Sequence, residues 1–106
     1  MRMWNVDPKL LCRKHLLGEH VEMHMFAGCL NKDKNINGYI EKGLVELEYI
    51  FYRHSHLAAE MFNRGFKHKS PLALLKFRTG GKVNVSENIE ELKRRCTECR
   101  KRIENQ

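Results

Sequence analysis

The sequence has no long apolar run. None of its 106 residues falls in a stretch approaching the roughly 20 consecutive apolar residues that a membrane-spanning helix needs. The N-terminus also lacks the apolar segment of a secretory signal. We therefore expect an intracellular, cytoplasmic protein with no membrane partner.

Cysteine is too scarce to predict a disulfide framework in such a chain. The four cysteines are Cys12, Cys29, Cys96 and Cys99. The first two fall in apolar strips, where buried thiols are common. Cys96 and Cys99 form a single C-x-x-C pair, which is a weak metal signal, although His20 and His24 could complete four ligands if the first and last helices met. We predict packing thiols and no bound metal.

Acidic residues are fewer than basic ones. The chain has 13 Asp and Glu and 20 Lys and Arg, which gives a formal net charge of +7. Such an excess favours nucleic acid as the partner, because basic side chains attract phosphates and release counterions. The length predicts one domain over residues 1–106, with a modest core and no room for a second catalytic domain.

Apolar periodicity predicts an all-α domain of about three main helices with long basic loops. The first helix should begin at Pro8 with Asp7 as its N-cap, because proline at the first helical position leaves no N–H unpaired. The second should run over residues 43–64 and stop at Gly65. The third should be capped by Ser86.

The connecting segments are rich in turn formers and cations. Residues 31–38 read as a basic surface loop, residues 71–77 as a short apolar helical turn, and residues 78–82 as a flexible loop whose glycines could hold a phosphate. The basic stretch after the second helix contains Lys67, His68 and Lys69 and could contact a DNA backbone. Arg53, in the second helix, is either a DNA contact or an ordinary surface residue.

The first helix carries a polar stripe. His15, Glu19 and Glu22 fall at i, i+4 and i+7 and share one face, with apolar strips on both sides. The six residues before Asp7 can fold back along this helix and bring the α-amino group beside the stripe. Carboxylates in that setting could have shifted pKa values and do acid–base work, although a solvated helix face is the simpler alternative.

Two blocks of sequence resemble the pyrimidine dimer DNA glycosylase family of the phage endonuclease V type. The first is Met1-Arg2, two apolar residues and Asn5, followed by the His15, Glu19 and Glu22 spacing. The second runs from residue 47 to residue 66 and includes Arg64-Gly65-Phe66. The blocks occur in the family's order and cover about half of the chain.

The resemblance implies a small helical enzyme, expected to be monomeric, that binds damaged double-stranded DNA and needs no cofactor. It places the nucleophilic amine on Met1, the neighbouring basic residue on Arg2 and the essential carboxylate on Glu22. The positions expected to support the site or bind DNA are Arg2, His15, Glu19, Arg53, Arg64, Lys67, His68 and Lys69. Because Arg2 is not small, we expect Met1 to be retained after translation and to supply the amine.

The expected reaction uses an α-amine, whose ordinary pKa of about 7.7 to 8.0 leaves a nucleophilic fraction near neutrality. The amine would form an imine with the deoxyribose and cut the strand by β-elimination, with the carboxylate moving protons. Val21 and Met25 stand where the phage enzyme has arginines, and that enzyme's aromatic and basic tail is absent, so we expect the phosphate or pocket contacts to come from other residues.

Three alternatives stay open. The chain could be a glycosylase or AP lyase for another lesion, which would share the amine chemistry. It could be a non-catalytic basic nucleic-acid-binding module, for which Met1 and Glu22 would be dispensable. It could also be a helical interaction protein with a structural zinc site at the C-x-x-C pair.

Overall fold

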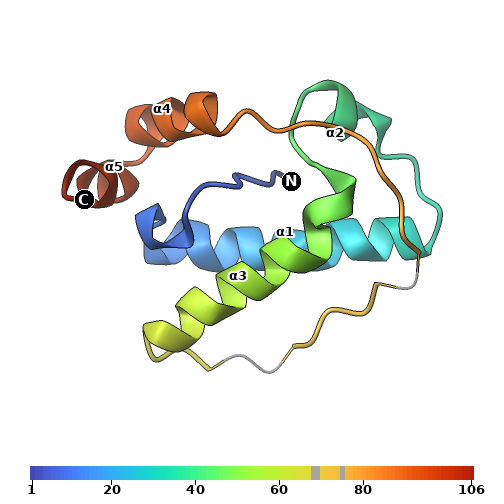
Figure 1. The fold of residues 1–106 in the computed structure, drawn as a ribbon, viewed down its shortest axis with the longest axis horizontal. Helices are drawn as coiled ribbons and strands as arrows, with labels where there is room; N and C mark the ends of the chain where they lie inside the picture. The colour runs from blue at the N-terminus through green and yellow to red at the C-terminus, as the bar shows by residue number, and fades with distance from the viewer. Residues whose placement is uncertain (68–69, 75) are drawn as a thin grey trace.

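The computed structural model describes residues 1–67, 70–74 and 76–106, and within these residues it contains helices and no β-strand. The predicted all-α class is therefore confirmed (Figure 1). The elements in chain order are the 3-10 turn η1 (Pro8–Leu10), α1 (Arg13–Asn31), α2 (Asn37–Glu41), the 3-10 turn η2 (Leu47–Tyr49), α3 (Ile50–Asn63), α4 (Val85–Arg95) and α5 (Thr97–Glu104).

The core forms where α1 and α3 cross (Figure 1). Each helix turns a row of large apolar side chains toward the other, spaced three, four or seven residues apart as the 3.6-residue period requires. Burial of each such side chain contributes about 1.5 to 3 kcal/mol. The fully or nearly fully buried members are Leu16, Met23, Phe26 and Leu30 from α1 and Ile50, Leu57 and Met61 from α3.

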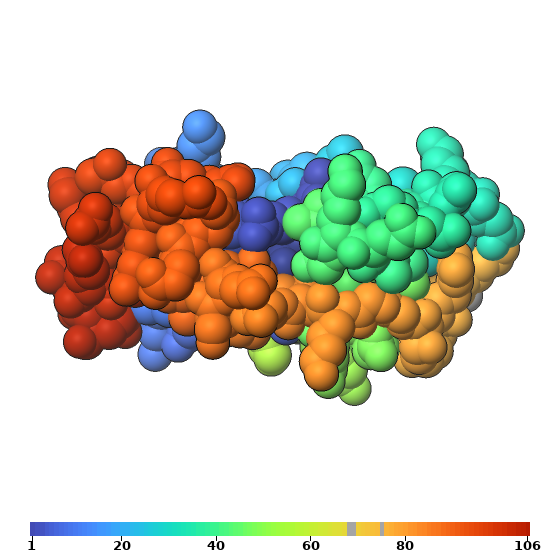
Figure 2. Space-filling model, turned by 90° about the horizontal axis from the view of Figure 1, so that it is seen from above, coloured from blue at the N-terminus to red at the C-terminus, as the bar shows by residue number. Residues whose placement is uncertain are grey.

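Residues 1–6, which we call the lead, fold back along α1 as predicted. Met3, Trp4 and Val6 are buried in the core. The backbone N–H of Met3 donates to Leu44 O at 2.7 Å, and Asn88 Nδ2 of α4 donates to Trp4 O at 2.8 Å. The lead is thus held between α1 and α4, and Figure 2 shows part of it at the surface between α4 and the segment that contains α2.

The first helix begins later than the sequence predicted. Asp7 caps as expected and accepts from the N–H of Lys9 at 3.0 Å, but Pro8 opens only the single turn η1. Leu11 then adopts an extended conformation and is fully buried, which ends the turn. The α-helix starts at Arg13, with Cys12 as its N-cap.

The other two predicted helices also need correction. The second starts at Ile50, because the chain from Gly43 (φ 68°) through buried Val45 is not helical; its stop at Gly65 (φ 82°) is confirmed. The third is two helices, α4 and α5, which are separated at extended Cys96. Its cap is Asn84, whose side chain accepts from Glu87 N at 3.0 Å, and not Ser86.

The connections differ from expectation in two places. The loop after α1 is shorter than predicted, since α2 begins at Asn37, and the described residues of 71–77 form no helix. The Gly80 N–H, one of the expected phosphate donors, instead donates to Glu48 Oε1 at 3.3 Å. Gly80 O accepts from Leu47 N at 2.9 Å, and a Cβ on Gly81 would lie 2.2 Å from Val45 O. These glycines allow close backbone packing against residues 45–47.

One ion pair is buried beneath the lead. Arg53 of α3 donates from Nε to Glu19 Oε2 at 2.5 Å and from a terminal nitrogen to Glu19 Oε1 at 2.9 Å. The second terminal nitrogen donates to Val6 O at 2.6 Å, and Glu19 Oε2 accepts from Trp4 N at 3.1 Å. Arg53 is 3% and Glu19 1% exposed. The pair therefore joins both core helices to the lead.

Replacing Arg53 by Met should lower the free energy of unfolding by about 3 to 5 kcal/mol, because the Glu19 carboxylate then stays buried without its counter-charge. Adding Glu19→Gln to this variant should recover part of the loss, since the amide is neutral and its oxygen still accepts from Trp4 N. Denaturant unfolding of the single and double variants measures both effects. A double variant less stable than Arg53→Met alone would contradict the charge argument.

Candidate active site

The chain's α-amino group lies beside the carboxylate of Glu22. Met1 N is 3.7 Å from Glu22 Oε1, and the same oxygen accepts from the backbone N–H of Arg2 at 3.1 Å. The Glu22 side chain is 29% exposed and that of Met1 is 11% exposed. The two groups form a half-buried amine–carboxylate pair that a substrate can still reach.

Partial burial of the amine–carboxylate pair shifts the pKa of the Glu22 carboxylate. Burial raises the pKa of Glu22 above its ordinary value, and the nearby Glu19 carboxylate acts in the same direction. The positive amine and the Arg2 N–H act the other way but do not cancel the effect of burial. A carboxylate with a raised pKa is a better proton acceptor near neutrality than an exposed one.

A second group of side chains surrounds Trp4 and fixes Arg2. The Arg2 guanidinium lies over the indole, 3.9 Å from the ring centroid, and donates to Asn88 Oδ1 at 2.5 Å. Arg95 lies over the same indole at 5.3 Å. Arg95 belongs to a basic run at the end of α4 that the sequence already suggests as a DNA-facing surface, whereas Asn88 has no such signal. The position of both residues beside Trp4 depends on how α4 docks, which is a tertiary property.

Two exposed apolar residues flank the carboxylate. Val21 is 54% and Met25 50% exposed, although the periodicity of the first helix placed both in an apolar strip with Leu17. They lie one turn apart and stand next to Glu22 on the helix surface. The carboxylate therefore has an apolar, solvent-facing neighbourhood on this side and a basic one around Trp4.

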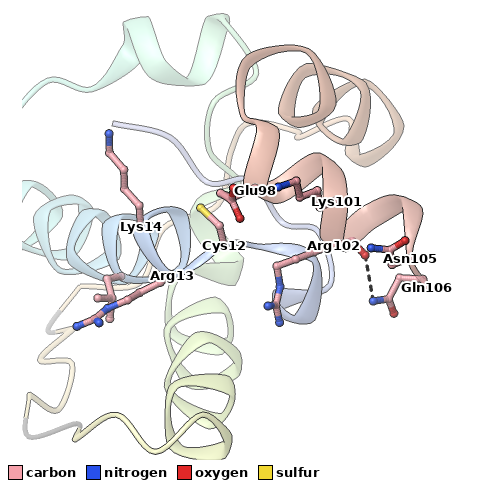
Figure 3. A pocket seen from close by; sticks show the side chains of 9 residues that line it. Cys12, Arg13, Lys14, Glu98, Lys101, Arg102, Asn105 and Gln106 are labelled. Atoms are coloured by element: carbon pink, nitrogen blue, oxygen red, sulfur yellow. Dashed lines mark hydrogen bonds and ion pairs between the residues drawn. The ribbon is translucent and has the colours of Figure 1, made fainter.

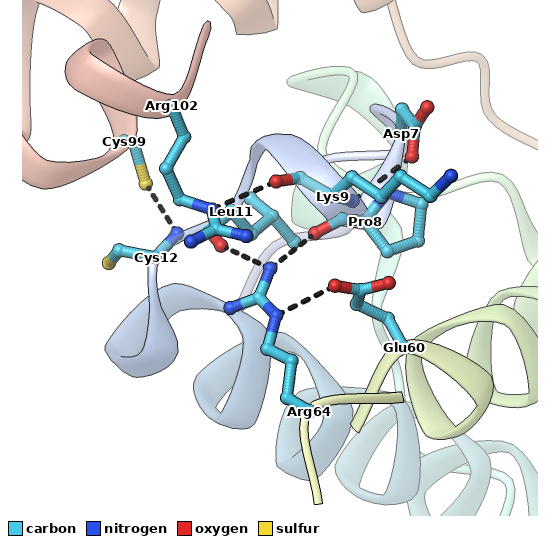
Figure 4. Close-up of polar contacts among 9 residues, drawn as sticks. All are labelled: Asp7, Pro8, Lys9, Leu11, Cys12, Glu60, Arg64, Cys99 and Arg102. Atoms are coloured by element: carbon cyan, nitrogen blue, oxygen red, sulfur yellow. Dashed lines mark hydrogen bonds and ion pairs between the residues drawn. The ribbon is translucent and has the colours of Figure 1, made fainter. Parts of the chain in front are cut away.

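The remaining predicted DNA-binding residues are spread over the molecule. Lys67 is exposed, whereas Glu19 and Arg53 are buried against each other and have no surface with which to contact a duplex. Arg64 is held on Glu60 Oε2 at 2.7 Å and on the carbonyls of Pro8 and Leu11 (Figure 4). The predictions for His68 and Lys69 lie outside the described residues.

Two pockets are relevant to the site. One of about 360 Å³ is bordered by Arg2 and Asn88 together with residues before and within α4. A larger one, about 770 Å³, lies between the start of α1 and α5, and its lining includes Arg13, Lys101 and Arg102 (Figure 3). Neither pocket is lined by Met1 or Glu22. The smaller one includes Arg2, whose backbone N–H donates to Glu22 Oε1, so it is the pocket that adjoins the amine–carboxylate pair.

Among the described residues, three cysteines and four histidines form two groups, neither of which is the combination considered from the sequence. His20 and His24 approach His54, and the Nε2 atoms of His24 and His54 are 3.1 Å apart. Cys96 and Cys99 instead approach the start of α1. His54 is buried.

The fold and the site define a small helical protein with its own amino terminus paired to a carboxylate. The family model for pyrimidine dimer DNA glycosylases matches residues 1–74. The chain belongs to this family, as the resemblance in its first helix implied, and the family's name describes DNA repair glycosylases that act on pyrimidine dimers. Damaged DNA is thus the partner that membership implies.

Comparison with curated proteins and with solved structures gives no match. Among the described residues, no helix has both the length and the apolar character needed to cross a membrane.

Glu22→Gln should not destabilise the protein near neutral pH. Because the pKa of Glu22 is raised in the folded state, ionisation of this carboxylate opposes folding at pH values above that pKa, and the neutral amide avoids the penalty. We expect a thermal midpoint equal to or above that of the native protein near neutrality. The difference should vanish at acidic pH, where Glu22 is protonated in both states.

Thermal unfolding followed by circular dichroism at several pH values measures this. A midpoint that falls near neutrality would contradict the assigned direction of the shift.

Proposed function

We propose that the protein is a DNA glycosylase with AP-lyase activity that acts on cyclobutane pyrimidine dimers in duplex DNA through its α-amino group. The observation that carries the proposal is the 3.7 Å approach of Met1 N to Glu22 Oε1. Membership of the family supplies the substrate class. The protein would work as a monomer, inside the cell where its substrate lies.

The first step is displacement of the base. The neutral Met1 amine attacks C1′ of the damaged nucleotide, and the C1′–N1 bond breaks with its electron pair leaving on the pyrimidine. As the C1′–N imine forms, the C1′–O4′ bond breaks and O4′ takes its electron pair. Of the two amine protons, one ends on O4′ and the other on the displaced pyrimidine. Glu22 lies within reach to accept a proton from the amine, and its negative charge stabilises the cationic sugar.

The second step is strand cleavage. Removal of a proton from C2′ of the imine expels the 3′ oxygen with the C3′–O electron pair, which is a β-elimination. Glu22 is again the nearest carboxylate to the amine and serves as the base. The step consumes no oxidant or reductant, and each proton released can pass through this one carboxylate.

Charge around Trp4 complements this chemistry. Arg2 and Arg95 bring two cations to the same indole, beside the lead. Val21 and Met25 offer no cation where the phage enzyme carries arginines, so Arg2 and Arg95 would supply the phosphate contacts instead. Exposed Val21 and Met25 would provide apolar surface for the flanking or extruded base.

The chemistry is tested by trapping the imine. Untagged protein is mixed in borohydride with duplexes that contain a pyrimidine dimer, an abasic site or no damage, and peptide mass mapping locates the adduct. We expect an adduct on the Met1 nitrogen with the first two duplexes. Nα-acetylated protein should give none, because the amine lone pair is then delocalised into the amide.

Two carboxylate variants sharpen the test. Glu22→Gln should lose trapping and cleavage by at least about 100-fold, the range of general acid–base contributions. Glu90→Gln makes the same change at an exposed residue of α4 and should retain activity. An adduct with abasic DNA only would overturn the dimer specificity, and binding without any adduct would favour a non-catalytic module.

Arg95→Gln should weaken binding to damaged duplex and reduce the slope of log K against log salt by about one. The reason is loss of one cation beside the lead. Arg100→Gln, at an exposed α5 residue, is the matched control and should bind more like native protein. Fluorescence anisotropy across a salt series measures both, and an unchanged slope for Arg95→Gln would remove this residue from the interface.

A further inference from the structure

Four metal-binding side chains from two distant parts of the chain meet where α1 and α5 begin. The Sγ atoms of Cys12, Cys96 and Cys99 and one ring nitrogen of His15 all lie within 4.8 Å of one another. Cys12 Sγ is 3.2 Å from His15 Nδ1 and 3.8 Å from Cys96 Sγ. Tetrahedral zinc with Zn–S bonds of about 2.3 Å places two sulfurs about 3.8 Å apart. We propose that these four residues bind a structural Zn²⁺ ion.

The two halves of the cluster have the same local geometry. Cys12 is the N-cap of α1, and its sulfur accepts from the N–H of His15 at 3.5 Å. Cys96 is the N-cap of α5, and its sulfur accepts from the N–H of Cys99 at 3.4 Å. In both cases the residue three positions on supplies the second ligand, so C-x-x-H and C-x-x-C present matching pairs.

Cysteine is not among the residues favoured at N-caps, so capping alone does not explain why it stands at two helix starts. A role as thiolate ligands of a metal ion does explain it. The positive end of a helix and backbone N–H donors both stabilise a thiolate, and such donors orient metal ligands. A third donor completes the arrangement, since the N–H of Cys12 points to Cys99 Sγ at 3.2 Å (Figure 4).

The docking of α5 supports the same conclusion. Among the residues of this eight-residue helix only Cys99 is buried, and in α4 only Asn88 and Leu92 are. Helices this short are not stable alone, and so few buried side chains give little hydrophobic stabilisation. A metal that joins Cys96 and Cys99 to α1 would supply what burial does not. The hydrogen bond from Arg102 Nε to Lys9 O, at 2.9 Å, adds one further tie.

The donor set favours zinc in a closed site. Three sulfurs and one imidazole nitrogen fill four tetrahedral positions, as in structural zinc sites, and leave none for a substrate. The other group, His20, His24 and His54, offers no sulfur. Cys12 also borders the larger pocket, which gives an ion a route to the cluster (Figure 3).

The proposed ion gives His15 a role different from the one that the resemblance implied. Its Nδ1 faces Cys12 and not the amine, and its ring packs edge-on against Trp4 at 5.9 Å. The family match ends at residue 74, so Cys96 and Cys99 lie beyond it. The ion would therefore fasten the C-terminal helices, which carry Asn88 and Arg95, onto the family portion of the chain.

The first experiment measures metal content. Untagged protein is produced with zinc in the medium, purified without chelators and analysed by inductively coupled plasma mass spectrometry. We expect one zinc ion per chain. Replacement by Co²⁺ should give thiolate-to-cobalt charge-transfer bands and the visible d–d bands of a tetrahedral site. Protein with no zinc and no tetrahedral cobalt spectrum would overturn the proposal.

Matched variants locate the site. Cys96→Ser changes a partly exposed ligand and should lose the zinc and the tetrahedral cobalt spectrum, whereas Cys29→Ser removes the one thiol outside the cluster and should keep both. His24→Gln should also keep them. Zinc lost in His24→Gln and retained in Cys96→Ser would place the metal in the histidine group and overturn the proposal.

Two further readouts keep the test independent of folding and of catalysis. Thiol titration of the denatured protein should find four free cysteines, and only two would indicate a disulfide and contradict the zinc site. Native protein stripped of metal at acidic pH should recover one Co²⁺ on titration, which needs no variant to fold. Strand cleavage is assayed separately, so full zinc occupancy without cleavage would count only against the proposed function.

Discussion

The buried pair between Glu19 and Arg53 is the interaction on which the site depends. It joins α1 to α3. Glu19 also accepts a hydrogen bond from the N–H of Trp4, and Arg53 donates one to the carbonyl of Val6. Ordering the six-residue lead costs conformational entropy of about 1 to 2 kcal/mol per residue, and the hydrogen bonds of this pair offset part of that cost beside the burial of Met3, Trp4 and Val6. The pair therefore determines where the α-amino group lies, although neither residue contacts that amine.

The proposed chemistry needs an N-terminus that is both fixed in position and accessible to substrate. Buried Met3, Trp4 and Val6 anchor the lead, and Glu22 remains partly exposed beside the amine. The half-buried carboxylate has a raised pKa, which suits proton transfer and opposes folding when the group is ionised. The partial burial of Glu22 thus favours the proposed proton transfer but lowers the stability of the folded state when the carboxylate is ionised. Burial of apolar side chains elsewhere in the core offsets this loss.

The C-terminal helices are fixed by polar groups more than by apolar ones. Asn88 connects α4 to the lead, Arg102 connects α5 to η1, and the cysteine and histidine cluster joins α5 to α1. A bound ion at that cluster would make the position of Arg95 over Trp4 depend on metal. Recognition of damaged DNA and retention of the ion would then be linked through the same pair of helices.

The all-α class, the fold-back of the lead and the closeness of Met1 to Glu22 followed from periodicity and resemblance, because helical spacing is local. Both sequence interpretations of Arg53 placed it at the surface, whereas it is buried, since burial depends on which helix packs opposite. Residues 96–99 could be recognised as a metal-binding pattern, but their partners could not. Only the docking of α5 brings Cys12 and His15 to them, and long-range packing has no signature in local sequence.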